Sequence, residues 1–191
     1  MFIFLDIDGV LNDKMTRNGP RNLRSSLFWQ EEDIDKDKIK ILNEIILRTG
    51  ANVILHSSWG KNWGKPYMTE FFNHLGLIKP LYDVTGGIFR ILEIKNKIKE
   101  LEIDQFVVLD DFDMIINFGE NQFMTDYDIG LLAEHIEPIV EILKRKINPD
   151  DFKIQPNEAV ILDGGDPDCM HSFGYCSSTG KLICKNCYGT Y

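Results

Sequence analysis

The sequence predicts an α/β fold built on a doubly wound parallel sheet, because short strand-like runs alternate along the chain with helical patterns. The runs cover residues 2–5, 53–55 and 106–109. Each is continuously apolar rather than alternating, as expected for strands that helices cover on both faces. The order strand, helix, strand, helix, strand therefore favours a parallel sheet.

The helices between these strands follow from the spacing of their apolar residues. Residues 39–46 carry apolar side chains at helical spacing, and the pattern stops at Gly50, a typical signal for the C-terminal end of a helix. Residues 91–101 repeat the pattern before the third strand. A last pattern covers residues 130–146, where Pro138 should either kink the helix or lie in the first turn of a second one.

Composition bounds the size and class of the protein. The 191 residues, 43% of them hydrophobic, suffice for one main domain with a small appendage. A formal net charge of -9 argues against nucleic-acid binding by broad electrostatic attraction, although a local basic patch remains open. The N-terminal apolar run is too short for a signal peptide, and no stretch approaches the roughly 20 apolar residues of a membrane span. We therefore expect a soluble, cytoplasmic protein.

Polar side chains follow the three predicted strands where each one ends. In an open parallel sheet, ligands bind beyond these carboxyl ends. The acids there would repel one another strongly unless a hard cation lay among them, and Mg²⁺ is the natural choice because it accepts carboxylate and carbonyl oxygens. The residues are Asp6 and Asp8 after the first strand, His56, Ser57 and Ser58 after the second, and Asp110 and Asp111 after the third.

These strand ends resemble motifs of the haloacid-dehalogenase (HAD) superfamily of phosphohydrolases. The first motif is matched by "DIDG", the second by "VILHSSW" and the fourth by "VVLDD". Together with "RILEI" and "TDYDIGL", the set is similar to the HAD-like domains of RNA-repair multidomain proteins and of phage. The resemblance spans residues 1–146 and implies a Rossmann-like HAD core.

The resemblance implies a role for each acid. Asp6 would be the nucleophile that forms an aspartyl-phosphate, and Asp8 the general acid and then the general base. The backbone carbonyl of Asp8 would also reach the metal. Ser57 would donate a hydrogen bond to a phosphoryl oxygen, on which charge spreads in the transition state. Asp110 and Asp111 would hold Mg²⁺ together with Asp6, and Asp111 is the preferred direct ligand.

The third motif of such enzymes is a cation that neutralises the phosphorylated intermediate. We favour Arg90, at the start of the helix before the third strand, because it fits the arginine of the narrower family. Arginine would hold the phosphate in a fork rather than as a point charge. Lys95 and Lys97 in the same helix and Lys79 in an earlier loop are the alternatives.

The expected substrate contacts lie in the second motif and in the loop after the first strand. Where the narrower family often has Ser-Ser-Trp-Arg, this chain has a glycine after the tryptophan, and Lys61 is expected to replace the arginine beside Ser58. Three arginines would form a basic patch for a substrate, with a solvated loop as the equal alternative. They are Arg17, Arg21 and Arg24.

The site is expected to be open, with a minimal cap. Residues 12–35 are too few for a full cap domain, and residues 60–87 show only one short helical pattern, around residues 68–75. An open site admits bulky substrates. A phosphate at a nucleic-acid end or on a protein is therefore as reasonable a substrate as a small metabolite.

The C-terminal tail has the spacing of a zinc site. We expect a phosphatase domain at residues 1–148, a linker at 149–165 and a zinc-binding tail at 166–191. The ligands would be Cys169, His171, Cys184 and Cys187, and Cys176 in place of His171 is the alternative. Free thiols or disulfides remain open. A tail this short has too little core to order itself, so the zinc would be structural or serve docking.

The function that follows is a Mg²⁺-dependent phosphomonoesterase that works through an aspartyl-phosphate, on nucleic-acid ends or nucleotides. Two alternatives remain. One is a phosphate-binding module without turnover, which the pair Asp6 and Asp8 disfavours because a binding protein needs no acid/base residue. The other is an adaptor whose main function lies in the zinc tail.

Overall fold

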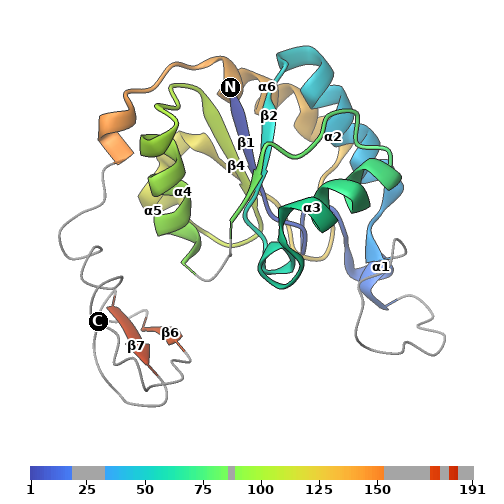
Figure 1. Cartoon of the computed structure of the whole chain (residues 1–191), viewed down its shortest axis with the longest axis horizontal. Coiled ribbons are helices and arrows are strands. Elements are labelled where there is room, and N and C mark those ends of the chain that lie inside the picture. The colour runs from blue at the N-terminus through green and yellow to red at the C-terminus, as the bar shows by residue number, and fades with distance from the viewer. Residues whose placement is uncertain (19–32, 86–88, 153–172, 177–180, 185–191) are drawn as a thin grey trace. The chain divides into compact units, whose positions relative to one another are not determined.

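The structure is a computed structural model that describes residues 1–18, 33–85, 89–152, 173–176 and 181–184 (Figure 1). The chain divides into two compact units, Met1–Phe152 and Lys153–Tyr191. We describe each unit by itself. No helix among these residues is long and apolar enough to cross a membrane.

The first unit is built on a five-stranded, all-parallel sheet of order β3-β2-β1-β4-β5. The central strand β1 (Phe2–Leu5) pairs with β2 (Asn52–Leu55) on one side and with β4 (Phe106–Asp110) on the other. These are the three predicted strands. The edge strands β3 (Asp83–Val84) and β5 (Gln122–Met124) were not predicted, because runs this short carry no recognisable pattern.

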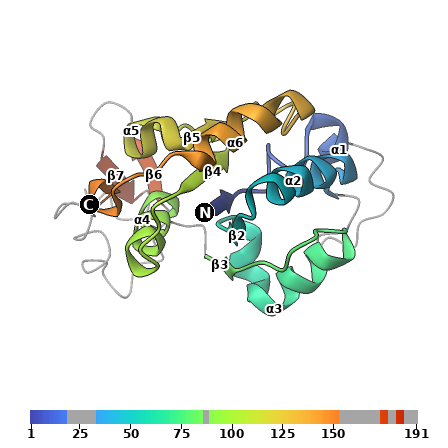
Figure 2. The same cartoon turned by 90° about the horizontal axis from the view of Figure 1, so that it is seen from above.

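Helices cover both faces of the sheet, as predicted. Side chains alternate along β1, so Ile3 and Leu5 join the hydrophobic cluster under α2 (Lys36–Thr49), α3 (Ser58–His74) and α6 (Ile136–Lys144). Phe4 points the other way, into a cluster with α4 (Arg90–Glu100) and α5 (Ile115–Phe118). Figure 1 shows the two groups on opposite sides of the sheet, and Figure 2 shows α2 beside α6, against which it packs.

Shorter elements complete the first unit. They are α1 (Lys14–Asn18) and the 3₁₀ turns Gly119–Asn121, Ala133–His135 and Pro149–Phe152. The predicted end of α2 is confirmed: Gly50 caps this helix and donates its N–H to the carbonyl of Ile46. Pro138 lies in the first turn of α6, which is a separate helix after the 3₁₀ turn, so the second of its two predicted roles is the correct one.

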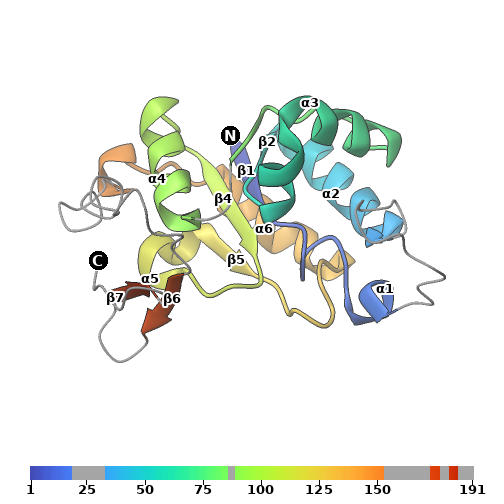
Figure 3. The ribbon, with the colours of Figure 1, turned by 60° about the horizontal axis from the view of Figure 1, so that its bottom comes forward.

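Helix α3 is longer than the sequence predicts. We expected a short helix around residues 68–75, but α3 runs for 17 residues with a sharp kink at Gly64. Figure 3 shows its two segments meeting at an angle. The first segment has no apolar periodicity of its own because Gly60 interrupts it and it ends at Gly64, with Pro66 just beyond the kink. Gly60 is required for packing, since a Cβ there would come within 2.3 Å of Val84 Cγ1 on β3.

Gly64→Ala is expected to lower the free energy of unfolding by about 1–3 kcal/mol. Gly64 has φ 70° and ψ 170°, a conformation that is essentially restricted to glycine. Gly50→Ala is the control, because Gly50 has φ 70° and ψ 11°, a left-handed conformation that other residues reach at a cost of about 1–2 kcal/mol. A Cβ at either position meets no close neighbour, so urea unfolding compares the two backbones alone. A Gly64→Ala loss smaller than the Gly50→Ala loss would contradict the prediction.

The second unit contains one described element, an antiparallel ribbon of β6 (Phe173–Cys176) and β7 (Lys181–Cys184). In its register Phe173 pairs with Cys184, and Cys176 pairs with Lys181. The backbone therefore places Cys176 at the end of one strand and Cys184 at the end of the other.

Candidate active site

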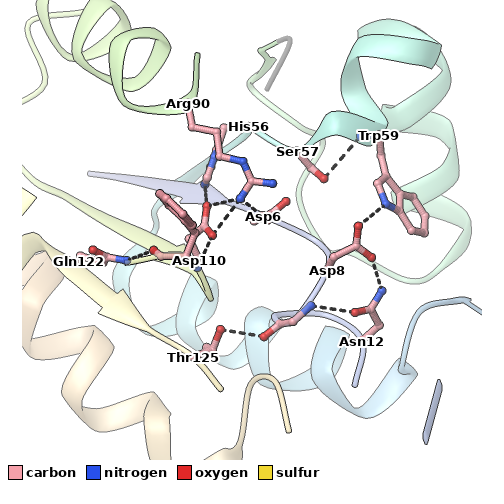
Figure 4. A network of polar contacts seen from close by, with 12 residues as sticks. Asp6, Asp8, Asn12, His56, Ser57, Trp59, Arg90, Asp110, Gln122 and Thr125 are labelled. Carbon is pink, nitrogen blue, oxygen red and sulfur yellow. Dashed lines mark hydrogen bonds and ion pairs between the residues drawn. The ribbon is translucent and has the colours of Figure 1, made fainter. Parts of the chain in front are cut away.

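The candidate site lies at the carboxyl edge of the sheet (Figure 4). The register aligns Leu5 of β1 with Leu55 of β2 and Leu109 of β4, so the polar residues that follow these strands start at one level. Asp6, His56 and Asp110 are all completely or almost completely buried there. The parallel sheet thus gathers the ends that the sequence motifs marked.

Three carboxylates form a cluster at this edge, which we call the acidic cluster: Asp6, Asp110 and Asp111. Each offers an oxygen, and these oxygens all lie within 4.8 Å of one another. Asp6 and Asp110 are 1% and 0% exposed, whereas Asp111 is half-buried. Three negative charges at this separation and burial need a cation nearby.

Arg90, the first residue of α4, supplies a positive charge to the cluster. Its Nη1 donates to Asp6 Oδ2 at 2.7 Å and to Asp110 Oδ2 and Oδ1 at 2.9 and 3.0 Å. The Arg90 side chain is 27% exposed, so it reaches the buried acids from the surface side of the site. Its role as the third-motif cation remains a prediction.

The alternative lysines have other roles in the structure. Lys97 pairs with Asp83 at 2.8 Å and also with Glu100. Lys79 donates to the carbonyl of Gly50 at 2.9 Å. Lys95 is buried in α4. The described contacts therefore favour Arg90 over these lysines.

The negative charges of the acidic cluster are not fully balanced by Arg90. Burial raises the pKa of Asp110, the Asp6 charge raises it further, and against the opposing Arg90 charge this pKa reaches about 7. Burial and the Asp6 charge also raise the pKa of Asp111. One arginine therefore does not fully compensate the three acids, and a further cation would lower the energy of the ionised cluster.

The cluster fits a hard divalent cation. Its donors are all carboxylate oxygens, the ligand type that Mg²⁺ prefers. Within the described part of the chain, the buried Oδ1 of Asp6 has no hydrogen-bond partner, which is rare for a buried carboxylate and leaves that oxygen available as a ligand. The acids predicted to hold Mg²⁺ thus meet here, except for Asp8.

The carboxylate of Asp8 lies apart from the acidic cluster and is held by two neutral donors. Trp59 Nε1 donates to its Oδ2 at 3.0 Å, and Asn12 Nδ2 donates to its Oδ1 at 2.8 Å. The side chain of Asp8 is not part of the group of acids that could hold a metal ion. The expectation that its backbone carbonyl reaches the metal remains a prediction.

Sequence reasoning did not find the residues that hold the loop after β1. The backbone N–H of Gly9 donates to Asn12 Oδ1 at 2.9 Å, and Thr125 Oγ1 donates to the Gly9 carbonyl at 2.7 Å. Gly9 also lies against Asp111, since a Cβ at Gly9 would come within 2.7 Å of the Asp111 carboxyl carbon. Thr125 belongs to the "TDYDIGL" stretch, but its role depends on β5, which the sequence did not reveal.

The second motif forms the start of α3. Ser57 is completely buried and caps the helix, accepting the N–H of Trp59 at a long 3.5 Å. Ser58 and Lys61 are exposed in the first turn. Ser57 is thus placed at the site's edge with its hydroxyl available to donate.

The predicted basic patch falls largely outside the described residues. Arg17 lies in α1, where only the backbone is described, and Arg21 and Arg24 lie outside the described ranges. The openness of the site depends on residues 19–32, which are also outside them. Both expectations remain predictions.

His56 lies beneath the acidic cluster. It is 0% exposed, and its Nε2 is 3.6 Å from Asp110 Oδ2. Burial lowers the pKa of His56 to about 3, and the Arg90 charge lowers it as well. The imidazole is therefore neutral at ordinary pH, and it adds no positive charge to the cluster.

Comparison with known proteins agrees with this arrangement. A parallel sheet with these acids at its carboxyl edge is the arrangement expected of a HAD-like domain, the class that the motifs indicated. The family described as "HAD domain in Swiss Army Knife RNA repair proteins" matches residues 2–136, and the chain belongs to that family. No curated protein and no solved structure matches the chain. The first unit therefore contains a HAD-like domain.

The zinc site of the tail remains a prediction. Of the four preferred ligands, Cys184 lies in β7, and the alternative ligand Cys176 lies in β6; for both, only the backbone is described. Cys169, His171 and Cys187 fall outside the described residues.

Proposed function

We propose that the protein is a Mg²⁺-dependent phosphomonoesterase that removes the terminal phosphate from an RNA end through an aspartyl-phosphate on Asp6. The observation that supports this most directly is the acidic cluster around Asp6, with Arg90 bonded to it and one Asp6 oxygen left without a partner. A module that only bound phosphate would gain nothing from placing two buried acids and a half-buried third beside an anionic ligand.

In this proposal Asp6 is the nucleophile, and Asp8 is the general acid and then the general base. A carboxylate oxygen of Asp6 attacks phosphorus, and the bond from phosphorus to the ester oxygen breaks. Asp8 gives its proton to the departing oxygen, which leaves as an alcohol. Asp8 then takes a proton from a water molecule that attacks the aspartyl-phosphate, so that inorganic phosphate and free Asp6 are formed.

The remaining residues stabilise charge. Asp6, Asp110 and Asp111 would hold Mg²⁺, which offsets the negative charge of the bound phosphate when it is present. Arg90 neutralises Asp6 and Asp110 before the substrate binds, and its guanidinium is the group that faces the phosphorylated Asp6. Ser57, at the N-terminus of α3, donates to a phosphoryl oxygen.

The substrate class rests on the family. Its HAD domains occur in RNA repair proteins, and this is why we propose a phosphate at an RNA end as the substrate. The net charge of -9 makes tight binding of a long RNA backbone unfavourable, so recognition is expected to centre on the terminal phosphate and the nucleotides beside it.

A substrate panel tests this proposal. The full chain is incubated with oligoribonucleotides that carry a 5′- or a 3′-phosphate, the matching oligodeoxyribonucleotides, mononucleotides, sugar phosphates and p-nitrophenyl phosphate. Release of inorganic phosphate is expected in Mg²⁺ and not in EDTA, with the highest kcat/KM on one type of RNA end. Hydrolysis of none of them would refute the phosphatase. Equal rates on all of them would refute the preference for RNA ends.

A further inference from the structure

We propose that Trp59 is a positioning residue for Asp8: its indole N–H fixes the carboxyl group that protonates the leaving oxygen. This inference rests on the proposed phosphatase function and adds a residue to it. The supporting contact is the hydrogen bond of 3.0 Å from Trp59 Nε1 to Asp8 Oδ2 (Figure 4).

The two donors on Asp8 fix the plane of its carboxyl group. Asn12 uses its Oδ1 to accept the N–H of Gly9, so its amide nitrogen is the end that faces Asp8. Trp59 can only donate, because the indole has no acceptor. Two donors on different oxygens, one from the loop after β1 and one from α3, leave the carboxyl group little freedom to rotate.

The indole ring is itself held firmly. Trp59 is 1% exposed and is the second residue of α3, two positions after the buried cap residue Ser57. Its ring centroid lies 6.3 Å from that of Phe71. Twelve residues would separate these rings by about 18 Å along a straight helix, so the kink at Gly64 is what brings Phe71 back onto Trp59.

The orientation of Asp8 matters most when the leaving oxygen needs a proton. A protonated carboxyl oxygen is a poor acceptor, so one of the two hydrogen bonds weakens when Asp8 carries the proton. The other bond keeps the group in place and directs the proton. An alkyl ester, such as the ribose ester at an RNA end, depends on this proton, whereas p-nitrophenolate leaves readily without it.

The test compares Trp59→Phe with the wild-type protein on two substrates, a phosphorylated oligoribonucleotide and p-nitrophenyl phosphate. Phenylalanine keeps an aromatic ring and removes the N–H. We expect kcat/KM on the alkyl ester to fall about 10–100-fold, a part of the roughly 100–10,000-fold that a general acid contributes, because the variant misplaces the acid but does not remove it. We expect kcat/KM on the aryl ester to change by less than about 3-fold. Equal losses on both substrates would show general damage to the site and overturn the inference.

Two controls sharpen the comparison. Trp63→Phe alters an aromatic residue of the same helix whose ring stacks on Tyr67, and the ratio of the two rates should not change. In an Asp8→Asn background, Trp59→Phe should have no further effect on the alkyl ester, because the group that it positions is gone. An additional loss there would overturn the inference.

Two further outcomes separate the hypotheses. If Trp59→Phe does not fold, benzothienylalanine at position 59 replaces it, because this residue keeps the bicyclic ring without the N–H. The ratio of kcat/KM on the two esters then tests the inference. If the wild-type protein hydrolyses no phosphate ester, the proposed function fails. If it hydrolyses both esters and the ratio is unchanged in the variant, only the role of Trp59 fails.

Discussion

Asp6→Asn is expected to reduce phosphate-ester hydrolysis by at least about 1,000-fold, because the enzyme loses its nucleophile. An amide has no anionic oxygen to attack phosphorus, and the remaining residues can only bind the ester. The fold should persist, since Arg90 keeps its two contacts to Asp110 when the contact to Asp6 is weakened. The measurement is the rate of phosphate release from the best substrate of the panel, together with a thermal melt.

A matched control is Asp113→Asn, which removes an exposed acid from the loop after β4. The oxygen of Asp113 accepts the N–H of Ile115, and an asparagine oxygen can do the same. Its activity should stay within about 3-fold of wild type. If Asp6→Asn kept more than a tenth of the activity, Asp6 would not be the nucleophile.

Trapping gives an independent readout of the same step. When a reaction is stopped with acid during turnover, the wild-type protein should carry a covalent phosphate that hydroxylamine removes, as an acyl phosphate does. Asp6→Asn should carry none. A phosphate retained on the variant would move the nucleophile to another residue.

The fold was largely predictable because its strongest signals are local. The strands β1, β2 and β4 are buried on both faces, so each is a run of apolar residues, and Gly50 marks the end of α2 by itself. Edge strands β3 and β5 have polar residues, Asp83 and Gln122, and too few positions to show a period. The first segment of α3 is stabilised by packing against β3, which the sequence does not reveal.

Part of the candidate site was likewise predictable from the sequence, and part was not. The sequence predicts that Asp6, Asp110 and Asp111 lie together, because parallel strands end at one edge of a sheet. The sequence does not predict the partners of Asp8. The hydrogen bond from Trp59 to Asp8, about fifty positions earlier, depends on how α3 is kinked and packed. Side-chain partners of this kind follow from tertiary structure rather than from a motif.

Arg90→Ala is expected to lower the free energy of unfolding in EDTA by about 3–5 kcal/mol, the usual cost of removing one partner from a buried ion pair. The variant leaves Asp6 and Asp110 buried without the cation that now lies 2.7 and 2.9 Å from them. Arg90→Lys should lose less, since lysine keeps the charge but not the guanidinium whose Nη1 contacts both acids. Urea unfolding measures all three proteins.

The exposed pair Arg48–Glu137 provides the control for this prediction. Its side chains are 35% and 63% exposed, so Arg48→Ala should cost no more than about 1 kcal/mol. A comparable loss in both arginine variants would mean that burial of the acids at the site has little energetic effect.

Mg²⁺ should then separate the roles of the arginine and the metal. Binding of a cation to the folded state alone raises stability by mass action. Because the acidic cluster of Arg90→Ala has lost its only bonded arginine among the described contacts, Mg²⁺ should raise the melting temperature of this variant more than that of the wild-type protein. A melting temperature that Mg²⁺ leaves unchanged in both proteins would mean that the three acids do not form a metal site, and that Arg90 alone balances their charge.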